Sequence, residues 1–284
     1  MTSGQRAVAK DETSPSTVEL CGGIVLLDHP EPGIGVITMN RPKARNALSL
    51  EMLAAMSEAL DLISQDDSVR AVVVAGNGPA FCAGHDLKEL TARRSDDDGG
   101  KSFYVETMTA CSALMMKIVH CDKPVIASVH AMATAAGCQL VATCDLAVAA
   151  DTAKFCTPGV NIGLFCSTPM VALSRNVSRK RAMEMLLLGE LISAEDAADF
   201  GLVNRAVAPE AVRDEAIDMA RRIAAKSSKT VAIGKSAFYS QIEKSLAGAY
   251  QETAEVMVHN MMERDAKEGI GAFLEKREPK WDNT

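Results

Sequence analysis

The chain has 284 residues and a formal net charge of −7, and 48% of its residues are apolar while 24% are charged. This composition supports a sizeable core and excludes a globally disordered chain. The acidic balance, without a run of five basic residues, argues against nucleic acid or an anionic membrane as the main partner.

The first 20 residues are polar and lack the apolar stretch of a secretory signal. They are also too acidic and too poor in arginine for a typical transit peptide, so we expect a mobile tail (residues 1–20) on a cytoplasmic protein. No apolar run is long enough to cross a bilayer. The eight cysteines form no CxxC pair, which predicts reduced thiols and no metal site.

The segments after the tail alternate between strands and helices. Residues 23–28 and 33–39 flank a proline-containing turn and predict a β-hairpin. The sequence then predicts helices at 49–66, 103–120 and 135–143, and strands at 71–76, 124–129 and 145–150. Fully apolar strands separated by helices are typical of parallel pairing with helical crossovers, which indicates an α/β fold.

From about residue 168 the pattern becomes almost entirely helical. Ser193 and Asp196 have the spacing of a capping box, and Pro209 suits a helix start. The last helices show no strand pattern beside them, so we expect them to pack on a neighbour or to cover the site. We therefore divide the chain into a core (residues 21–205) and a C-terminal helical oligomerisation region (residues 206–284).

Several familiar motifs are incomplete. GKS at 234–236 lacks the upstream glycine of a phosphate-binding loop, and PGIGVIT lacks the third glycine of a dinucleotide-binding turn. HExxH and G-x-S-x-G are both absent from the sequence. These patterns therefore predict neither a nucleotide site nor a zinc or serine hydrolase.

Four separated segments carry a more specific pattern: NRPKARNALSLEML (40–53), AFCAGHDLKEL (80–90), KPVIASVHAMATAAGCQLVATCDLAVAADTAKFCTPGVNIGL (123–164) and LLLGELISAEDAADFGLVNRAV (186–207). In this order and spacing they resemble the crotonase (enoyl-CoA hydratase/isomerase) superfamily. The resemblance implies a right-handed ββα spiral core with a C-terminal helical trimerisation region. It also implies a homotrimer or a dimer of trimers.

The resemblance further implies a site for an acyl-CoA or enoyl-CoA thioester. The backbone N–H groups of His85 and Ala136 would form an oxyanion hole that holds the thioester carbonyl as it becomes an enolate. Ala136 starts the helix 135–143, where free N–H groups and the positive end of the dipole lie together. The His85 ring would form a wall of the pocket. Alone, the small residues at 135–137 would indicate only tight packing.

The resemblance also places CoA contacts in three segments. The residues at the matching positions are Lys43, Ala44 and Arg45, then Asp86, Leu87 and Lys88, and, from the last helix of a neighbouring subunit, Phe273, Lys276 and Arg277. Cations suit the phosphates of CoA, although each taken alone could equally be a solvated surface charge. CoA would be part of the substrate or ligand, and no other cofactor is expected.

Hydratases of this superfamily use two glutamates to move protons, and both are replaced here. Gln139 stands at the first position and Gly159 at the second. An amide cannot accept a proton from water at neutral pH, and glycine has no side chain. Each lost acid or base typically lowers the rate by about 10²- to 10⁴-fold. We therefore expect no efficient two-glutamate hydration.

Three hypotheses remain open from the sequence. The first is an enzyme of fatty-acid or related acyl-CoA metabolism that works through a thioester enolate with a non-standard acid or base, for which Asp86 is the first candidate. The second is a non-catalytic acyl-CoA-binding or scaffold protein. The third is a thioester hydrolase assisted by Cys166. Asp145 is expected to form a structural hydrogen bond.

Overall fold

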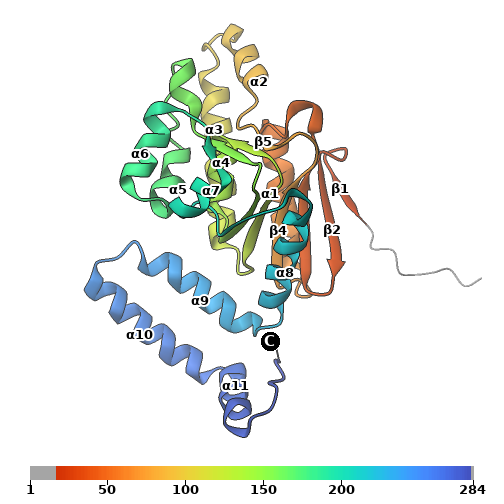
Figure 1. Ribbon diagram of the computed structural model, residues 1–284, viewed down its shortest axis with the longest axis vertical. Coiled ribbons are helices and arrows are strands. Elements are labelled where there is room, and N and C mark those ends of the chain that lie inside the picture. The colour runs from red at the N-terminus through yellow and green to blue at the C-terminus, as the bar shows by residue number, and fades with distance from the viewer. Residues whose placement is uncertain (1–16, 283–284) are drawn as a thin grey trace, which may run out of the picture.

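The computed structural model describes residues 17–282 (Figure 1). Residues 1–16 of the predicted tail lie outside this range. Strand β1 (Val18–Leu20) pairs antiparallel with the next strand, so the tail was predicted too long at its end. Three residues are too few for a strand pattern to be recognised in a polar segment.

A seven-stranded sheet, in the order β1-β2-β3-β4-β6-β8-β11, forms the centre of the molecule. Strands β1 to β3 are antiparallel and the remaining neighbours are parallel, as the apolar strand pattern predicted. The strands after β1 are β2 (Val25–Glu31), β3 (Ile34–Met39), β4 (Ala71–Gly76), β6 (Val125–Val129), β8 (Leu146–Ala150) and β11 (Arg205–Val207).

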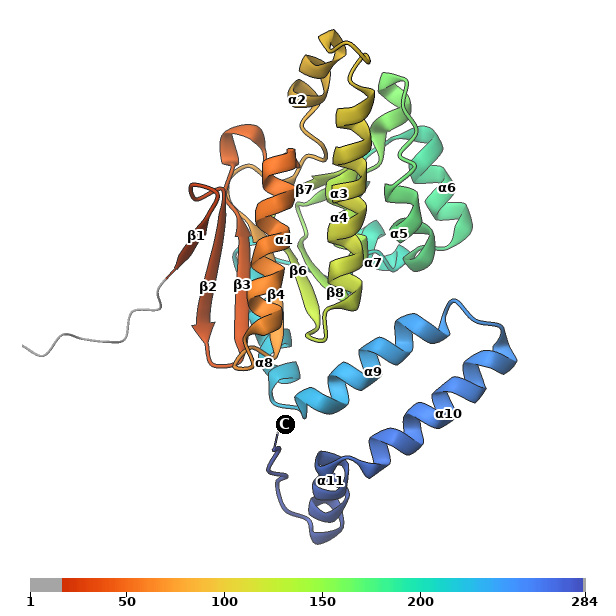
Figure 2. The ribbon, with the colours of Figure 1, turned by 180° about the vertical axis from the view of Figure 1, so that it is seen from behind.

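Helices cover both faces of this sheet. Helices α1 (Leu50–Gln65) and α3 (Lys101–His120) lie on one face, and α8 (Val212–Ala224) packs on the other (Figure 2). The Ser49 hydroxyl caps α1 by accepting from the Met52 N–H. This layered arrangement buries β3 and β6 throughout, and β4 and β8 except for one end residue each.

A second, smaller sheet has the order β10-β9-β7-β5 and was not predicted. Its strands have two or three residues each, too short to show alternation: β5 (Ala80–Cys82), β7 (Met132–Thr134), β9 (Lys154–Cys156) and β10 (Ile192–Ser193). Five short helices lie around it: α2 (Leu87–Ala92), α4 (Ala136–Thr143), α5 (Pro169–Asn176), α6 (Arg179–Leu188) and α7 (Ala194–Phe200). The predicted capping box of Ser193 and Asp196 begins α7.

The last three helices project from the core as an arm (Figure 1). They are α9 (Ser228–Gln241), α10 (Leu246–Met262) and α11 (Arg264–Glu275). The arm is anchored where Lys235 and Tyr239 of α9 bond Asp145 of the core. The chain returns after α11, and the Trp281 Nε1 donates to the Ala225 carbonyl at the end of α8.

The predicted boundary between core and helical region is misplaced. A division after residue 205 would cut β11, which pairs with β8, and would assign α8 to the arm although α8 covers the sheet. The prediction of an almost entirely helical chain after residue 168 likewise misses β10 and β11. An amphipathic pattern shows that a helix has an apolar face but not which partner that face meets.

Candidate functional site

The end of β5 and the start of α4 come into close backbone contact. A Cβ at Gly84, where φ is +84°, would lie 2.9 Å from the Ala135 Cβ and 3.3 Å from the Ala136 nitrogen. A Cβ at Gly137 would lie 2.2 Å from the Cys82 carbonyl oxygen. Because no side chain stands between them, the two segments meet backbone to backbone.

Two unpaired N–H groups lie beside this contact. Neither the His85 nor the Ala136 N–H donates a hydrogen bond to any group within residues 17–282. Ala136 is the first residue of α4, where no acceptor exists within the helix. In the bridge between His85 and Leu48, the donors are instead Leu48 and Asp86. Two free backbone donors in one place can bind an oxygen that carries negative charge.

The residue just before α4 is held in an unusual conformation. Ala135 has φ +50° and ψ −117°, a region that L side chains rarely adopt. Its N–H donates to the Cys156 carbonyl at 2.9 Å, which ties the start of α4 to the end of β9. The contact with β9 therefore fixes the direction in which α4 begins, at the cost of a strained backbone at Ala135.

A buried asparagine that sequence reasoning missed organises the strand leading to Gly84. The Asn46 side-chain amide donates to the carbonyls of Asn77, Ala80 and Phe81, and its oxygen accepts from the Arg41 N–H. A fully buried amide with this many partners fixes the backbone of β5 and of the turn before it. The available signal was an asparagine between a turn and an apolar helix, which is not specific.

The His85 ring is enclosed by protein. Both ring nitrogens are closed to solvent and form no hydrogen bond of ordinary geometry with a group in the described chain. Burial lowers the pKa of His85, and the nearby Leu48 carbonyl only partly opposes this. The imidazole is therefore neutral at neutral pH.

Gln139 is a buried amide in an apolar helix. Every residue of α4 is buried, and Gln139 is 5% exposed. Its Oε1 is enclosed and has no hydrogen-bond partner among the described residues. The small exposed part of the side chain therefore includes the amide nitrogen. This nitrogen can donate a hydrogen bond but cannot act as a base.

The position of Gly159 is closed by the loop that follows it. A Cβ at Gly159 would lie 2.9 Å from both the Cys166 Sγ and the Leu164 carbonyl oxygen. Gly159 belongs to a 3-10 turn (Pro158–Ile162), and its carbonyl accepts from the Leu164 N–H at 2.9 Å. The Cys166 thiol thus occupies the space into which a side chain at residue 159 would project.

The carboxylates of Asp86, the candidate acid, and of Asp145 both have partners within the chain. Asp86 caps α2 and pairs with Arg41 at 2.9 Å. Burial opposes ionisation of Asp86, but Arg41 and the backbone N–H groups at the start of α2 outweigh it and lower its pKa. Asp145 accepts from the Val125 N–H and from Lys235 and Tyr239, as the structural interpretation predicted. Asp86 is therefore an ionised capping group rather than a proton donor.

Two of the three predicted CoA-contact segments lie together. Lys43, Ala44 and Arg45 form the turn before Asn46, and the Arg45 carbonyl accepts from the Ala83 N–H. Asp86, Leu87 and Lys88 start α2 one step beyond His85. Phe273, Lys276 and Arg277 instead lie on or just after α11, in the arm, away from this site in the same chain (Figure 1).

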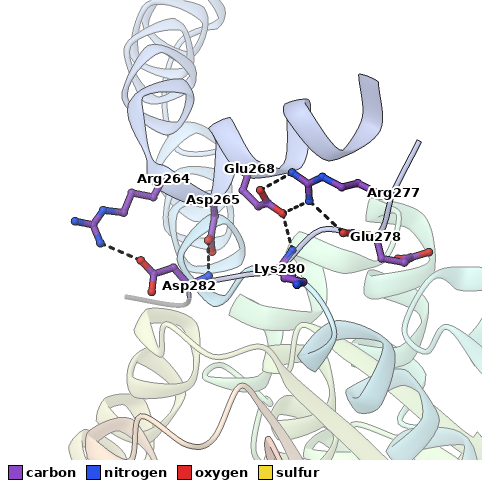
Figure 3. Close-up of a pocket in the computed structure, with 7 residues that line it drawn as sticks. All are labelled: Arg264, Asp265, Glu268, Arg277, Glu278, Lys280 and Asp282. Carbon is purple, nitrogen blue, oxygen red and sulfur yellow. Dashed lines mark hydrogen bonds and ion pairs between the residues drawn. The ribbon is translucent and has the colours of Figure 1, made fainter. Parts of the chain in front are cut away.

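An open hollow of about 520 Å³ lies between α11 and the chain end, away from the site (Figure 3). It is lined by Arg264, Asp265, Glu268, Arg277, Glu278, Lys280 and Asp282. Arg277 bonds Glu268 and lowers its pKa to about 2, and Arg264 pairs with Asp282. These contacts fasten the chain end to α11, so Arg277 is already engaged within the arm.

All eight cysteines are free thiols. Burial raises the pKa of Cys82 to about 12 and that of Cys156 to about 11, so these thiols stay protonated. Among residues 17–282, no three side chains of His, Cys, Asp or Glu are arranged to hold a metal ion. In the same range, no helix combines the length and apolarity that a membrane crossing needs.

A family model described as enoyl-CoA hydratase/isomerase matches residues 30–284. The chain belongs to this family. Enoyl-CoA hydratase domain-containing protein 3, mitochondrial, of Xenopus laevis is 47% identical over 88% of this chain and 84% of that protein. Its human counterpart is 46% identical over 88% of this chain and 80% of its own length.

Solved structures of enoyl-CoA hydratase/isomerase family members show the same fold. An enoyl-CoA hydratase from Mycobacterium smegmatis is 53% identical with a TM-score of 0.87, covering 91% of this chain and 98% of its own. Human enoyl Coenzyme A hydratase domain-containing protein 3 is 44% identical with a TM-score of 0.86. The match covers 91% of this chain and 100% of the human chain. The chain therefore has the crotonase-type core with a C-terminal helical region.

The comparison with curated proteins contradicts the predicted cytoplasmic localisation. The similar curated proteins from Xenopus laevis, rat, human and mouse are all named mitochondrial. The prediction used the composition of residues 1–20, of which 1–16 lie outside the described residues. Amino-acid composition over so short a segment does not decide the compartment.

Proposed function

We propose that this protein binds acyl-CoA thioesters and polarises their carbonyl with the backbone N–H groups of His85 and Ala136. The observation that supports this most is the pair of unpaired donors beside the contact of Gly84 with α4. Developing negative charge on a thioester oxygen would satisfy both donors at once. One such donor typically contributes about 3–4 kcal/mol to transition-state stabilisation.

The proposed chemistry is a lyase- or isomerase-type reaction of acyl-CoA or fatty-acid metabolism through a thioester enolate, without two-glutamate hydration. Gln139 supplies an amide, and Gly159 is covered by Cys166. The segments of Lys43 to Arg45 and Asp86 to Lys88 flank the donors and would hold the CoA moiety.

The polarisation can be measured directly on a bound thioester. With butyryl-CoA labelled with ¹³C at the carbonyl, we expect the infrared carbonyl band to fall on binding because two N–H groups withdraw electron density. Gly84→Ala should reduce the shift, since its Cβ separates the two segments. Gly99→Ala is the matched control: its φ is also positive, but nothing lies within 4 Å of its Cβ. An unshifted band in the bound wild type would refute the proposal.

Hydration is tested separately by the loss of enoyl absorbance from crotonyl-CoA. We expect wild type to be silent. The variant Gln139→Glu/Gly159→Glu restores both carboxylates, and adding Cys166→Gly removes the thiol that lies 2.9 Å from the new Cβ. Rapid hydration by wild type would contradict our interpretation of these positions. Thioester binding with a shifted band but no turnover of any thioester would favour a binding or scaffold protein.

We also propose that the protein is a homotrimer or a dimer of trimers. The arm supports this, since no residue of α9 or α10 is buried and Leu246 and Phe273 are 76% and 81% exposed. Phe273 and Lys276 would then reach a neighbour's CoA site, whereas Arg277 would first have to exchange its bonds to Glu268 for a CoA phosphate. Light scattering at micromolar concentration tests the assembly, and a monomeric mass would refute it.

A further inference from the structure

The unpaired His85 N–H belongs to a peptide group whose other end is held in place. The Leu48 N–H donates to the Gly84 carbonyl at 2.8 Å. Because this peptide group is planar and trans, the Gly84 carbonyl and the His85 N–H point in opposite directions. The hydrogen bond from Leu48 therefore sets the direction in which the His85 N–H points.

The peptide group that contains the Leu48 N–H is held in turn by Arg41. The Nη1 atom of Arg41 donates to the Ala47 carbonyl at 3.2 Å. Ala47 and Leu48 share this peptide group, so its N–H points away from the guanidinium and toward Gly84. Two peptide groups in series thus lead from the Arg41 cation to the His85 N–H.

The fold fixes the position of the Arg41 guanidinium. Its Nη2 atom donates to the Asp86 Oδ2 at 2.9 Å, and the side chain is 31% exposed. The Arg41 N–H donates to the Asn46 side-chain oxygen at 2.9 Å, and the Asn46 N–H returns a bond to the Arg41 carbonyl. These contacts lie within the chain, so the guanidinium is in place before any ligand binds.

The two donors of the proposed oxyanion hole differ in this respect. The Ala136 N–H shares its peptide group with the Ala135 carbonyl, which accepts only the Gln139 N–H of α4. A hydrogen bond to a carbonyl polarises the peptide group and strengthens its N–H as a donor, typically by about 10–30% per bond. Of the two, the His85 N–H is the one that ends a chain beginning at a cation.

Resting on the proposed function, we infer that Arg41 is a positioning residue for the oxyanion hole. It directs and polarises the His85 N–H through two peptide groups and does not touch the thioester. Its positive charge strengthens the bond from this N–H to an oxygen that gains negative charge. Arg41 precedes the predicted CoA contacts at 43–45, and its role differs from theirs, because it acts on the thioester carbonyl rather than on the phosphates.

The first test needs no ligand. Gly84–His85 is the sole Gly-His pair in the sequence, so labelling with carbonyl-¹³C glycine and ¹⁵N histidine yields a single HNCO signal, from this peptide group. In Arg41→Met we expect the ¹³C and ¹⁵N shifts to move to lower frequency, because the hydrogen bond to this carbonyl weakens. Arg70→Met is the matched control: Arg70 is also partly buried, and its Nη1 donates to the Ala224 carbonyl, on another part of the core. Its signal should match wild type.

The second test uses the infrared carbonyl band of bound ¹³C-labelled butyryl-CoA. Arg41→Met should reduce the shift of this band by about 10–30%, with a dissociation constant near that of wild type. Loss of a charged hydrogen bond to a CoA phosphate would instead weaken binding by about 10- to 100-fold. Arg41→Lys keeps a cation and should give a band between those of Arg41→Met and wild type. If Arg41→Met does not fold, Arg41→Gln, which carries a neutral amide, replaces it in both tests.

The outcomes separate this inference from the proposed function. If Arg41→Met matches wild type in the Gly84–His85 signal and in the band, or if Arg70→Met changes them equally, the inference is wrong. If affinity falls while the band stays, Arg41 is a CoA contact and the inference is again wrong. If the band of wild type does not shift on binding, the proposed function fails, whereas the NMR comparison still decides whether Arg41 acts on this peptide group.

Discussion

The core and the arm use similar helices in different ways. Helix α8 buries six of its residues against the large sheet, whereas α10, which is longer, buries none within the described chain. Apolar side chains such as Leu246, Tyr250 and Met262 of α10 stay largely exposed. The core therefore gains its stability from its own burial, and the arm depends on its anchors and on whatever covers its apolar face.

The largest expected effect is at the anchor between the two regions. Asp145→Asn leaves the Lys235 ammonium, which is 7% exposed, without its carboxylate at 2.7 Å. Loss of one partner of a buried pair typically destabilises by about 3–5 kcal/mol. Urea unfolding should show this loss. For comparison, Glu243→Gln breaks an exposed pair with Arg175 and should change stability by under about 1 kcal/mol. Equal effects of the two variants would mean that the anchor is no stronger than a surface contact.

Glycine substitutions sharpen the comparison further. Gly137→Ala places a Cβ 2.2 Å from the Cys82 carbonyl, a backbone atom that cannot move away alone. Overpacking of this kind should destabilise the protein by about 3 kcal/mol. Gly271→Ala in α11 has nothing within 4 Å of its Cβ and should stabilise the helix by up to about 1 kcal/mol. Thermal unfolding measures both, and a neutral Gly137→Ala would show that α4 can shift away from β5.

The smallest expected effect concerns the Asp86 carboxylate and depends on pH. The folded-state pKa of Asp86 is lowered, so the carboxylate stabilises the fold above the unfolded pKa, and this stabilisation is lost as pH falls through the folded pKa. Asp86→Asn keeps a capping side chain but loses the charge next to Arg41, and should destabilise by about 1 kcal/mol at pH 7.

Unfolding measured from pH 7 down to pH 3 tests this prediction. The difference between wild type and Asp86→Asn should shrink as pH falls below about 4, because Asp86 of the unfolded chain then takes up a proton before folded Asp86 does, which favours unfolding. Asp86→Ala is the companion variant: it also removes the cap and should lose about 1 kcal/mol more at every pH. A difference that stays constant with pH would mean that the Arg41 contact contributes nothing.

The elements that the sequence predicted well are those with long, regular patterns. Strand β4 has the predicted bounds, 71–76, and α1 lies within one residue of its predicted range. The short strands β5, β7, β9 and β10 of the second sheet, and β11 at the edge of the large sheet, were missed because two or three residues show no period. Their pairing depends on segments far apart in the chain, which local propensity does not report.

The candidate site likewise has features that the sequence predicted and features that only the structure showed. The identities of Gln139 and Gly159, and with them the lack of two carboxylates, follow from the sequence alone. That Cys166 fills the space above Gly159, and that Asp86 is engaged by Arg41, emerged only from the folded chain.

By itself the sequence determined the alternating core, the family resemblance and the chemistry available at each position, because these depend on residue type and spacing. The tertiary structure decided which backbones touch, which N–H groups stay unpaired and which helix faces stay open. Gly84 illustrates the difference: its missing side chain is visible in the sequence, but only the fold places Ala136 beside it. The physical reason is that contacts between distant segments depend on the packing of the whole core rather than on any local pattern.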